Sequence, residues 1–145
     1  MITLSADREE AIRREGERAY PNECCGIILG SIAEDGTSDN GRVVADILPI
    51  ENAREAGEQY HRFRIEPEDL MKAELAARKR KLDVLGFYHS HPDHPAKPSD
   101  YDKEHALPYY SYIITAVEKG KAGDFTSWEL KTDRSEFLQE HIKRL

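Results

Sequence analysis

Cysteine is almost absent from this sequence of 145 residues, which contains two. Cys24 and Cys25 are adjacent, a spacing that rarely supports a structural disulfide and offers no CxxC pair for a metal. A disulfide-stapled secreted scaffold is therefore excluded. The cysteine content is typical of a protein from a reducing compartment.

Long hydrophobic runs are missing as well. No apolar stretch approaches the ~20 residues of a membrane span. Residues 1–20 also lack the apolar core behind a basic region that a secretory signal needs. We therefore expect a cytoplasmic protein that has no membrane partner.

Positive charge is not in excess. The chain has 21 Lys and Arg against 28 Asp and Glu, so its formal net charge is −7. Nucleic acids and anionic membranes bind cationic surfaces, so neither is expected as the main partner. The one basic cluster, Ala77 to Leu82, is interpreted as a solvated helix end whose cations suit the negative pole of the helix dipole.

The rest of the composition is that of a globular protein, with 39% apolar and 34% charged residues and no repeat or low-complexity tract. A chain of this length can bury one core but does not divide comfortably into two. We therefore expect one domain over residues 1–145.

The hydrophobic pattern predicts helices interleaved with strands. The predicted helices cover residues 6–20, 66–81, 99–106 and 134–145, and the predicted strands cover 24–32, 42–50, 61–65, 82–91, 109–117 and 125–130. Residues 33–41 are predicted to form a turn, and 51–60 an exposed loop. This order indicates an α/β or α+β layered domain, but it does not give the order of the strands.

Two helices carry clear signals. Ser5 is a plausible N-cap of the first helix, which Pro21 ends. In the helix at 66–81, acidic residues crowd the start and basic residues the end. Its predicted apolar side consists of Leu70, Met71, Leu75 and Ala77.

The densest cluster of chemically active side chains is "GFYHSHPDHPAKPSDYD", from Gly86 to Asp102. On a strand, side chains two residues apart share a face, so His89 and His91 would point together. Ser99 can cap a helix with Asp102 in its first turn, which lets this carboxylate fold back onto the histidines. Two imidazoles and one carboxylate form the protein part of a catalytic zinc site and leave the fourth position to water.

Taken alone, this pattern leaves alternatives open. The histidines also fit a polar, solvated turn, and a ligand set of two histidines and one carboxylate also suits iron. Glu23 directly precedes an apolar strand, where a carboxylate can be held in a cleft, but an ordinary loop acid fits that position too.

Taken together, the residues resemble the JAB1/MPN/Mov34 (JAMM) metalloenzyme family. The family motif places a glutamate well upstream of HSHP, then a serine and an aspartate at fixed spacing. Here it is filled by Glu23, by "HSHP" at His89 to Pro92, and by Ser99 and Asp102. The stretch "PNECCGIILG" is also similar, and the resemblance covers about Tyr20 to Val117.

The resemblance implies a mixed β-sheet flanked by helices, an MPN or cytidine-deaminase-like fold. It also implies that His89, His91 and Asp102 bind Zn²⁺, that Glu23 is the general base, and that Ser99 stabilises the oxyanion. The expected reaction is hydrolysis of a peptide or isopeptide bond after the C-terminal Gly-Gly of a ubiquitin-like or sulfur-carrier protein. The loop Glu51 to Tyr60 is a candidate wall for the substrate groove.

Other functions remain in competition with this one. The first is a catalytically silent MPN scaffold that binds a protein partner, although silent members usually lack a motif residue. The second is a RadC-like member linked to DNA repair, which the acidic charge disfavours. A nucleophilic Cys24 or Cys25 with a histidine base is a further alternative, but nothing in the sequence organises such a dyad. His94 is given no direct role because the ligand set is already full, and the sequence indicates no oligomeric state.

Overall fold

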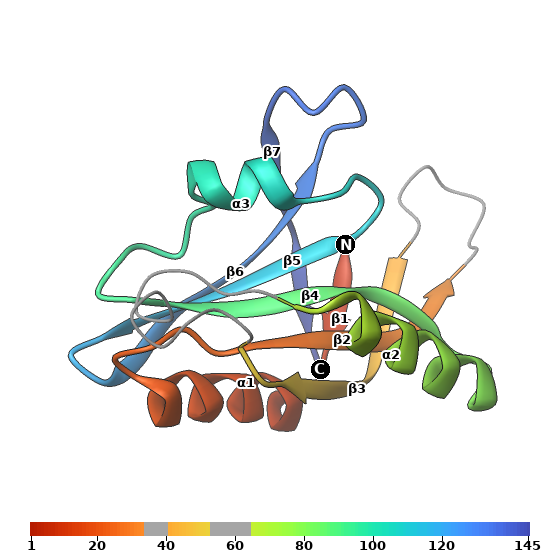
Figure 1. Ribbon diagram of the computed structural model, residues 1–145, viewed down its shortest axis with the longest axis horizontal. Coiled ribbons are helices and arrows are strands. Elements are labelled where there is room, and N and C mark those ends of the chain that lie inside the picture. The colour runs from red at the N-terminus through yellow and green to blue at the C-terminus, as the bar shows by residue number, and fades with distance from the viewer. Residues whose placement is uncertain (34–40, 53–64) are drawn as a thin grey trace.

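The computed structural model describes residues 1–33, 41–52 and 65–145 (Figure 1). The helices are α1 (Ala6–Ala19), α2 (Pro67–Lys79) and α3 (Asp100–His105). The strands are β1 (Ile2–Leu4), β2 (Cys25–Ala33), β3 (Gly41–Ile50), β4 (Asp83–Pro92), β5 (Ser111–Glu118), β6 (Lys121–Leu130), β7 (Phe137–Glu140) and β8 (Ile142–Arg144).

The described strands form one mixed sheet in the order β7-β6-β5-β4-β2-β3-β1-β8. β4 pairs parallel with β5 and antiparallel with β2, so it lies in the middle of the sheet. β7 and β8 lie at opposite ends of this order, yet His141 alone joins them. A flat sheet would separate its outer strands by roughly 34 Å at ~4.8 Å per strand, so this sheet must curl.

The two faces of the sheet are covered by different helices (Figure 1). α1 packs against β4, β5 and β6, whereas α2 packs against β2 and β4. The core under α1 contains Ile2, Leu4, Ile12, Cys24, Ile28, Leu85, Tyr88, Ile113 and Phe125. The core on the other face contains Ile27, Leu29, Ala73, Ala77, Phe87, Ala106, Tyr112 and Leu130.

An irregularity in β4 sets which of its side chains face the helix α2. The register against β2 shifts between Gly86 and Val84, so Leu85 is skipped. Such a bulge reverses the facing of the residues beyond it. After it, Tyr88 belongs to the core under α1 and Phe87 to the core under α2.

Several sequence predictions are confirmed. The first three helices form, and Ser5 caps α1 by accepting a hydrogen bond from the Arg8 backbone N–H at 3.3 Å. The mixed, helix-flanked sheet is the expected fold class. The predicted turn at 33–41, loop at 51–60 and strand at 61–65 fall largely outside the described residues, so they stay predictions, as does the single domain.

Other predictions are wrong. The segment 134–145, predicted as a helix, forms β7 and β8 because β6 and β1 offer it hydrogen-bond partners. Strand β1 was not predicted. On α2, Ala73 and Ala77 face the core, whereas Met71 and Leu75 are exposed. Within the described residues, no helix is both long and apolar enough to cross a membrane.

Candidate metal centre

Three ligand atoms meet where β4 ends and α3 begins. His89 Nε2 lies 3.1 Å from His91 Nε2, and Asp102 Oδ2 lies 3.3 Å from the first and 3.2 Å from the second. A tetrahedral zinc ion with bonds of ~2.0–2.1 Å holds its ligand atoms roughly 3.3–3.4 Å apart. The three atoms therefore match one triangular face of such a tetrahedron.

The cap of α3 places the carboxylate. The Ser99 Oγ accepts a hydrogen bond from the Asp102 backbone N–H at 3.1 Å, and the Asp102 Oδ2 accepts one from the Ser99 backbone N–H at 2.9 Å. This reciprocal capping box fixes the first turn of the helix and with it the direction of the Asp102 side chain. Ser99 thus has a visible positioning role, and its hydroxyl hydrogen remains able to donate.

The protonation states of the group suit a divalent cation. His91 Nδ1 lies 2.8 Å from the Pro95 carbonyl oxygen, so this nitrogen carries the hydrogen and Nε2 keeps its lone pair. Burial lowers the pKa of His89, which keeps that imidazole neutral. Burial alone would raise the pKa of Asp102, but His89, His91 and the Ser99 backbone hold it far below its ordinary value. The group therefore presents the Nε2 atoms of two imidazoles and one carboxylate to a common point.

Glu23 approaches this group from the turn before β2. Its side chain is buried, with 6% of the residue exposed. The Cys24 backbone N–H that follows donates to Ser90 Oγ at 2.8 Å, and the Ser90 backbone N–H donates to the Cys24 carbonyl at 3.2 Å. Ser90 lies between the two histidines on the strand but on its opposite face, so β4 holds both the ligands and the backbone beside Glu23.

Sequence reasoning overlooked Ser90 and the Pro95 carbonyl. For Ser90 a signal existed, because a polar residue between two ligands on a strand must enter the opposite, apolar face and needs a partner there.

Burial and, to a lesser extent, the nearby Asp102 charge together raise the pKa of Glu23 to about 9. Glu23 is a carboxylate with high proton affinity that lies beside the three metal-ligand atoms. It is therefore suited to accept and return a proton.

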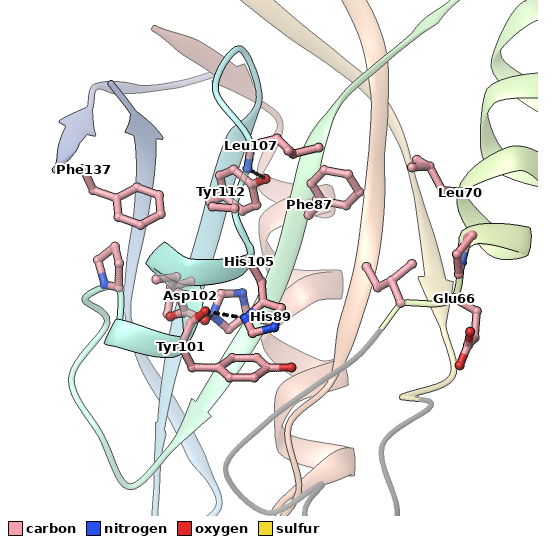
Figure 2. Close-up of a pocket in the computed structure, with 15 residues that line it drawn as sticks. Glu66, Leu70, Phe87, His89, Tyr101, Asp102, His105, Leu107, Tyr112 and Phe137 are labelled. Carbon is pink, nitrogen blue, oxygen red and sulfur yellow. Dashed lines mark hydrogen bonds and ion pairs between the residues drawn. The ribbon is translucent and has the colours of Figure 1, made fainter. Parts of the chain in front are cut away.

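Two cavities border the metal group. We call the first the apolar cavity; it measures about 310 Å³ and includes His89 and Asp102 in its wall (Figure 2). We call the second the polar cavity; it measures about 320 Å³ and is lined by Glu23, His91, His94, Pro95, Lys97 and Ser99. All five predicted site residues thus border one or the other.

Competing candidates gain no support from the structure. Burial raises the pKa of Cys24 to about 12 and raises that of Cys25 as well, so both thiols stay protonated. His94 borders the polar cavity but is not part of the ligand group, which among the described residues consists of His89, His91 and Asp102.

Comparison with known proteins identifies the family. Residues 5–131 match the family described as prokaryotic homologs of the JAB domain. The chain belongs to this family. Among its curated relatives is a desampylase from Haloferax volcanii, which is 32% identical over 122 residues, 81% of this chain and 81% of the relative. The resemblance found from the motif is thereby confirmed.

Solved structures share the fold of this chain. A protein of known solution structure from Desulfitobacterium hafniense has a TM-score of 0.84 and 31% identity, covering 100% of this chain and 93% of that chain. One from Salinibacter ruber has a TM-score of 0.74 and 40% identity, covering 100% and 92%. A JAB1/MPN domain protein from Archaeoglobus fulgidus, at 16% identity and a TM-score of 0.60 over 100% and 99%, shares the fold.

Proposed function

We propose that this JAB-family protein is a zinc-dependent hydrolase that cleaves a peptide or isopeptide bond after the Gly-Gly of a ubiquitin-like or sulfur-carrier protein. The observation that carries the proposal is the juxtaposition of the triangle His89, His91 and Asp102 with the buried Glu23. Zinc held by the triangle would supply an acidified water, with a pKa near ~7, and a Lewis acid for the carbonyl.

The residues of the chain have separate tasks. Glu23 takes the proton of the attacking water and returns it to the departing amine. A cation bound by His89, His91 and Asp102 would oppose the burial and the Asp102 charge that raise the pKa of Glu23, and so would make its carboxylate form available near neutral pH. Ser99 donates its hydroxyl hydrogen to the developing oxyanion while its oxygen accepts from Asp102.

The substrate class is supported by the family. The relative named desampylase supports a ubiquitin-like protein as the substrate. A glycine pair also suits the site, because glycine lets the backbone approach closely to the buried His89 and His91 that the two cavities border.

The test uses ubiquitin-like and sulfur-carrier proteins that carry a C-terminal extension. Zinc-loaded wild-type protein and its Glu23→Gln variant are incubated with each substrate, and intact masses are recorded. We expect cleavage after Gly-Gly by the wild type and a loss of about 10²–10⁴-fold in the variant. Elemental analysis should give one zinc per chain in both.

The same experiment separates the enzyme from a silent scaffold. A zinc-loaded wild type that leaves every substrate intact, but co-elutes with one of them in gel filtration, would support the scaffold and contradict the hydrolase. Loss of zinc in His89→Ala, with a fold unchanged by circular dichroism, is the control for the ligand assignment.

A further inference from the structure

The positions of the two cavities indicate the orientation of a substrate in the site. We propose that the apolar cavity binds a large apolar side chain that directly precedes the glycine pair of the substrate, and that the leaving amine lies in the polar cavity. This inference rests on the proposed hydrolase and adds to it a preference for sequence and an orientation of the substrate.

The orientation follows from the position of the proton carrier. The departing amine must receive a proton from Glu23, so it has to lie on the side of the metal group where Glu23 lies. Glu23 lines the polar cavity together with His91 and Ser99. The acyl chain must then leave on the other side, along His89 and Asp102, which both line the apolar cavity (Figure 2).

The walls of the apolar cavity select the chemistry of its occupant. Phe87 and Tyr112 stack with their ring centres 5.6 Å apart, and Phe137 meets Tyr112 edge-on at 6.0 Å. The Tyr112 hydroxyl is already engaged, since it accepts the Leu107 backbone N–H at 2.8 Å. Figure 2 shows these rings on one side and Leu70 of α2 on the other. A hydrocarbon side chain therefore fits this space better than a polar one.

The size of the cavity fits one such side chain with its adjoining backbone. A volume of about 310 Å³ corresponds to roughly ten water molecules at ~30 Å³ each. Glycine has no side chain to fill this space. In an extended chain, two glycines place the preceding residue about 7 Å from the scissile bond, at ~3.3 Å per residue. That residue is the first that can enter the cavity.

The test combines one change in the enzyme with one in the substrate. Leu107, at the cavity, and Leu75, on α2 and outside it, are both 50% exposed. Leu107→Asp therefore places a charge at the cavity, and Leu75→Asp is its matched control. The substrates are acetyl-Ala-Leu-Gly-Gly and acetyl-Ala-Ser-Gly-Gly, each coupled to aminomethylcoumarin.

For the wild type and Leu75→Asp, we expect kcat/KM to be at least tenfold higher with leucine than with serine. In Leu107→Asp, the ratio should fall below about threefold, with one zinc still bound per chain. Phe137→Ala is a second variant with the same expectation should Leu107→Asp fail to fold. Equal ratios in all folded variants would overturn the proposal.

A binding measurement keeps the cavity testable apart from hydrolysis. The free acids acetyl-Ala-Leu-Gly-Gly and acetyl-Ala-Ser-Gly-Gly are titrated into zinc-loaded Glu23→Gln protein, with or without Leu107→Asp, in a calorimeter. We expect about tenfold tighter binding of the leucine peptide, and the loss of that difference with Leu107→Asp.

The two arms fail in different ways. A leucine preference in binding that depends on Leu107, without cleavage of any substrate, would keep the cavity assignment and refute the hydrolase. Cleavage without a leucine preference, or indistinguishable binding of the two peptides, would refute the cavity assignment and leave the hydrolase in place.

Discussion

Glu23 and Glu140 are both 94% buried, yet their surroundings differ completely. Glu140 Oε1 accepts hydrogen bonds from Ser111 and Ser127 at 2.7 and 2.8 Å, and its Oε2 lies 2.9 Å from Arg42 Nη1. Among the described residues, none donates a hydrogen bond to the Glu23 carboxylate.

The two pKa values therefore move in opposite directions. Burial alone would raise the pKa of Glu140, but hydrogen bonds from Glu129, Ser111 and Ser127 and the charge of Arg42 hold it below its ordinary value. At Glu23 burial and the Asp102 charge act in the same direction and raise the pKa to about 9. The two carboxylates are equally buried, so the hydrogen-bond donors around them make the difference. Glu140 is fixed as a charged partner of strand residues, whereas Glu23 can exchange a proton.

The largest effect should come from removing the well-partnered carboxylate. Glu140→Ala leaves two buried hydroxyls without their acceptor and removes the buried partner of Arg42, which keeps Glu129 and the Tyr109 carbonyl, so we expect a loss of about 3–5 kcal/mol in the free energy of unfolding. Glu136→Ala is the control, since Glu136 is an exposed partner of Lys131 outside this cluster, and should cost less than about 1 kcal/mol. Urea titrations that give the two variants equal losses would contradict the comparison.

The next effect concerns Glu23 in protein stripped of metal. Its folded pKa lies above its unfolded value, so the stability it contributes is present below pH 4.5 and is lost as the pH rises toward about 9. Glu23→Gln cannot ionise, so the variant should be more stable than the wild type at pH 8 by on the order of 4 kcal/mol and match it near pH 4.5. Thermal melts across this pH range measure the difference. A wild type whose stability relative to Glu23→Gln does not fall as the pH rises would contradict the prediction.

A smaller effect is expected when one hydrogen-bond donor to Glu140 is removed. Ser127→Ala should lower the free energy of unfolding by about 2 kcal/mol, because a charged acceptor loses a buried hydroxyl. A carboxylate with a lowered pKa contributes stability that is lost as the pH falls through its folded pKa, so raising that pKa should move acid unfolding to higher pH. Ser31→Ala, at an exposed strand position, is the control and should leave the acid transition in place.

The smallest effect should come from the hydroxyl that holds the backbone beside Glu23. Ser90→Ala removes the acceptor of the Cys24 N–H and should cost about 1 kcal/mol of stability. Turnover should fall about tenfold while zinc content and KM stay unchanged, since Glu23 loses its position and not its charge. Ser90→Thr keeps the hydroxyl and should restore the rate. A fall in zinc content would instead point to a disturbed β4.

Sequence patterns were sufficient where local signals carry the structure. Ser5, Pro21 and the acidic start of α2 mark helix ends through short-range chemistry, and the spacing of His89 and His91 on β4 fixes their common face. Ser99 and Asp102 form a local cap, so the spacing could bring Asp102 to the two histidines, whereas the assignment of these residues as zinc ligands needed the family resemblance.

Patterns failed where distant partners decide the structure. The segment around Phe137 and Ile142 is rich in good helix formers, and its period fits a helix, but pairing with β6 and β1 outweighs this weak preference. The role of Glu140 could not be read either, because its partners Arg42, Ser111 and Ser127 lie 98, 29 and 13 residues away.

The single-residue link through His141 also bears on the order in which the protein folds. The hairpins β2–β3 and β5–β6 join neighbours in the chain, whereas β1 meets β8 across nearly the whole sequence, with Ile2 opposite Ile142. Closing so long a loop is slow, so we expect this pairing to form last. Until it does, β1 presents an unpaired edge beside the apolar Ile2 and Leu4, the stage at which the chain is most prone to aggregate.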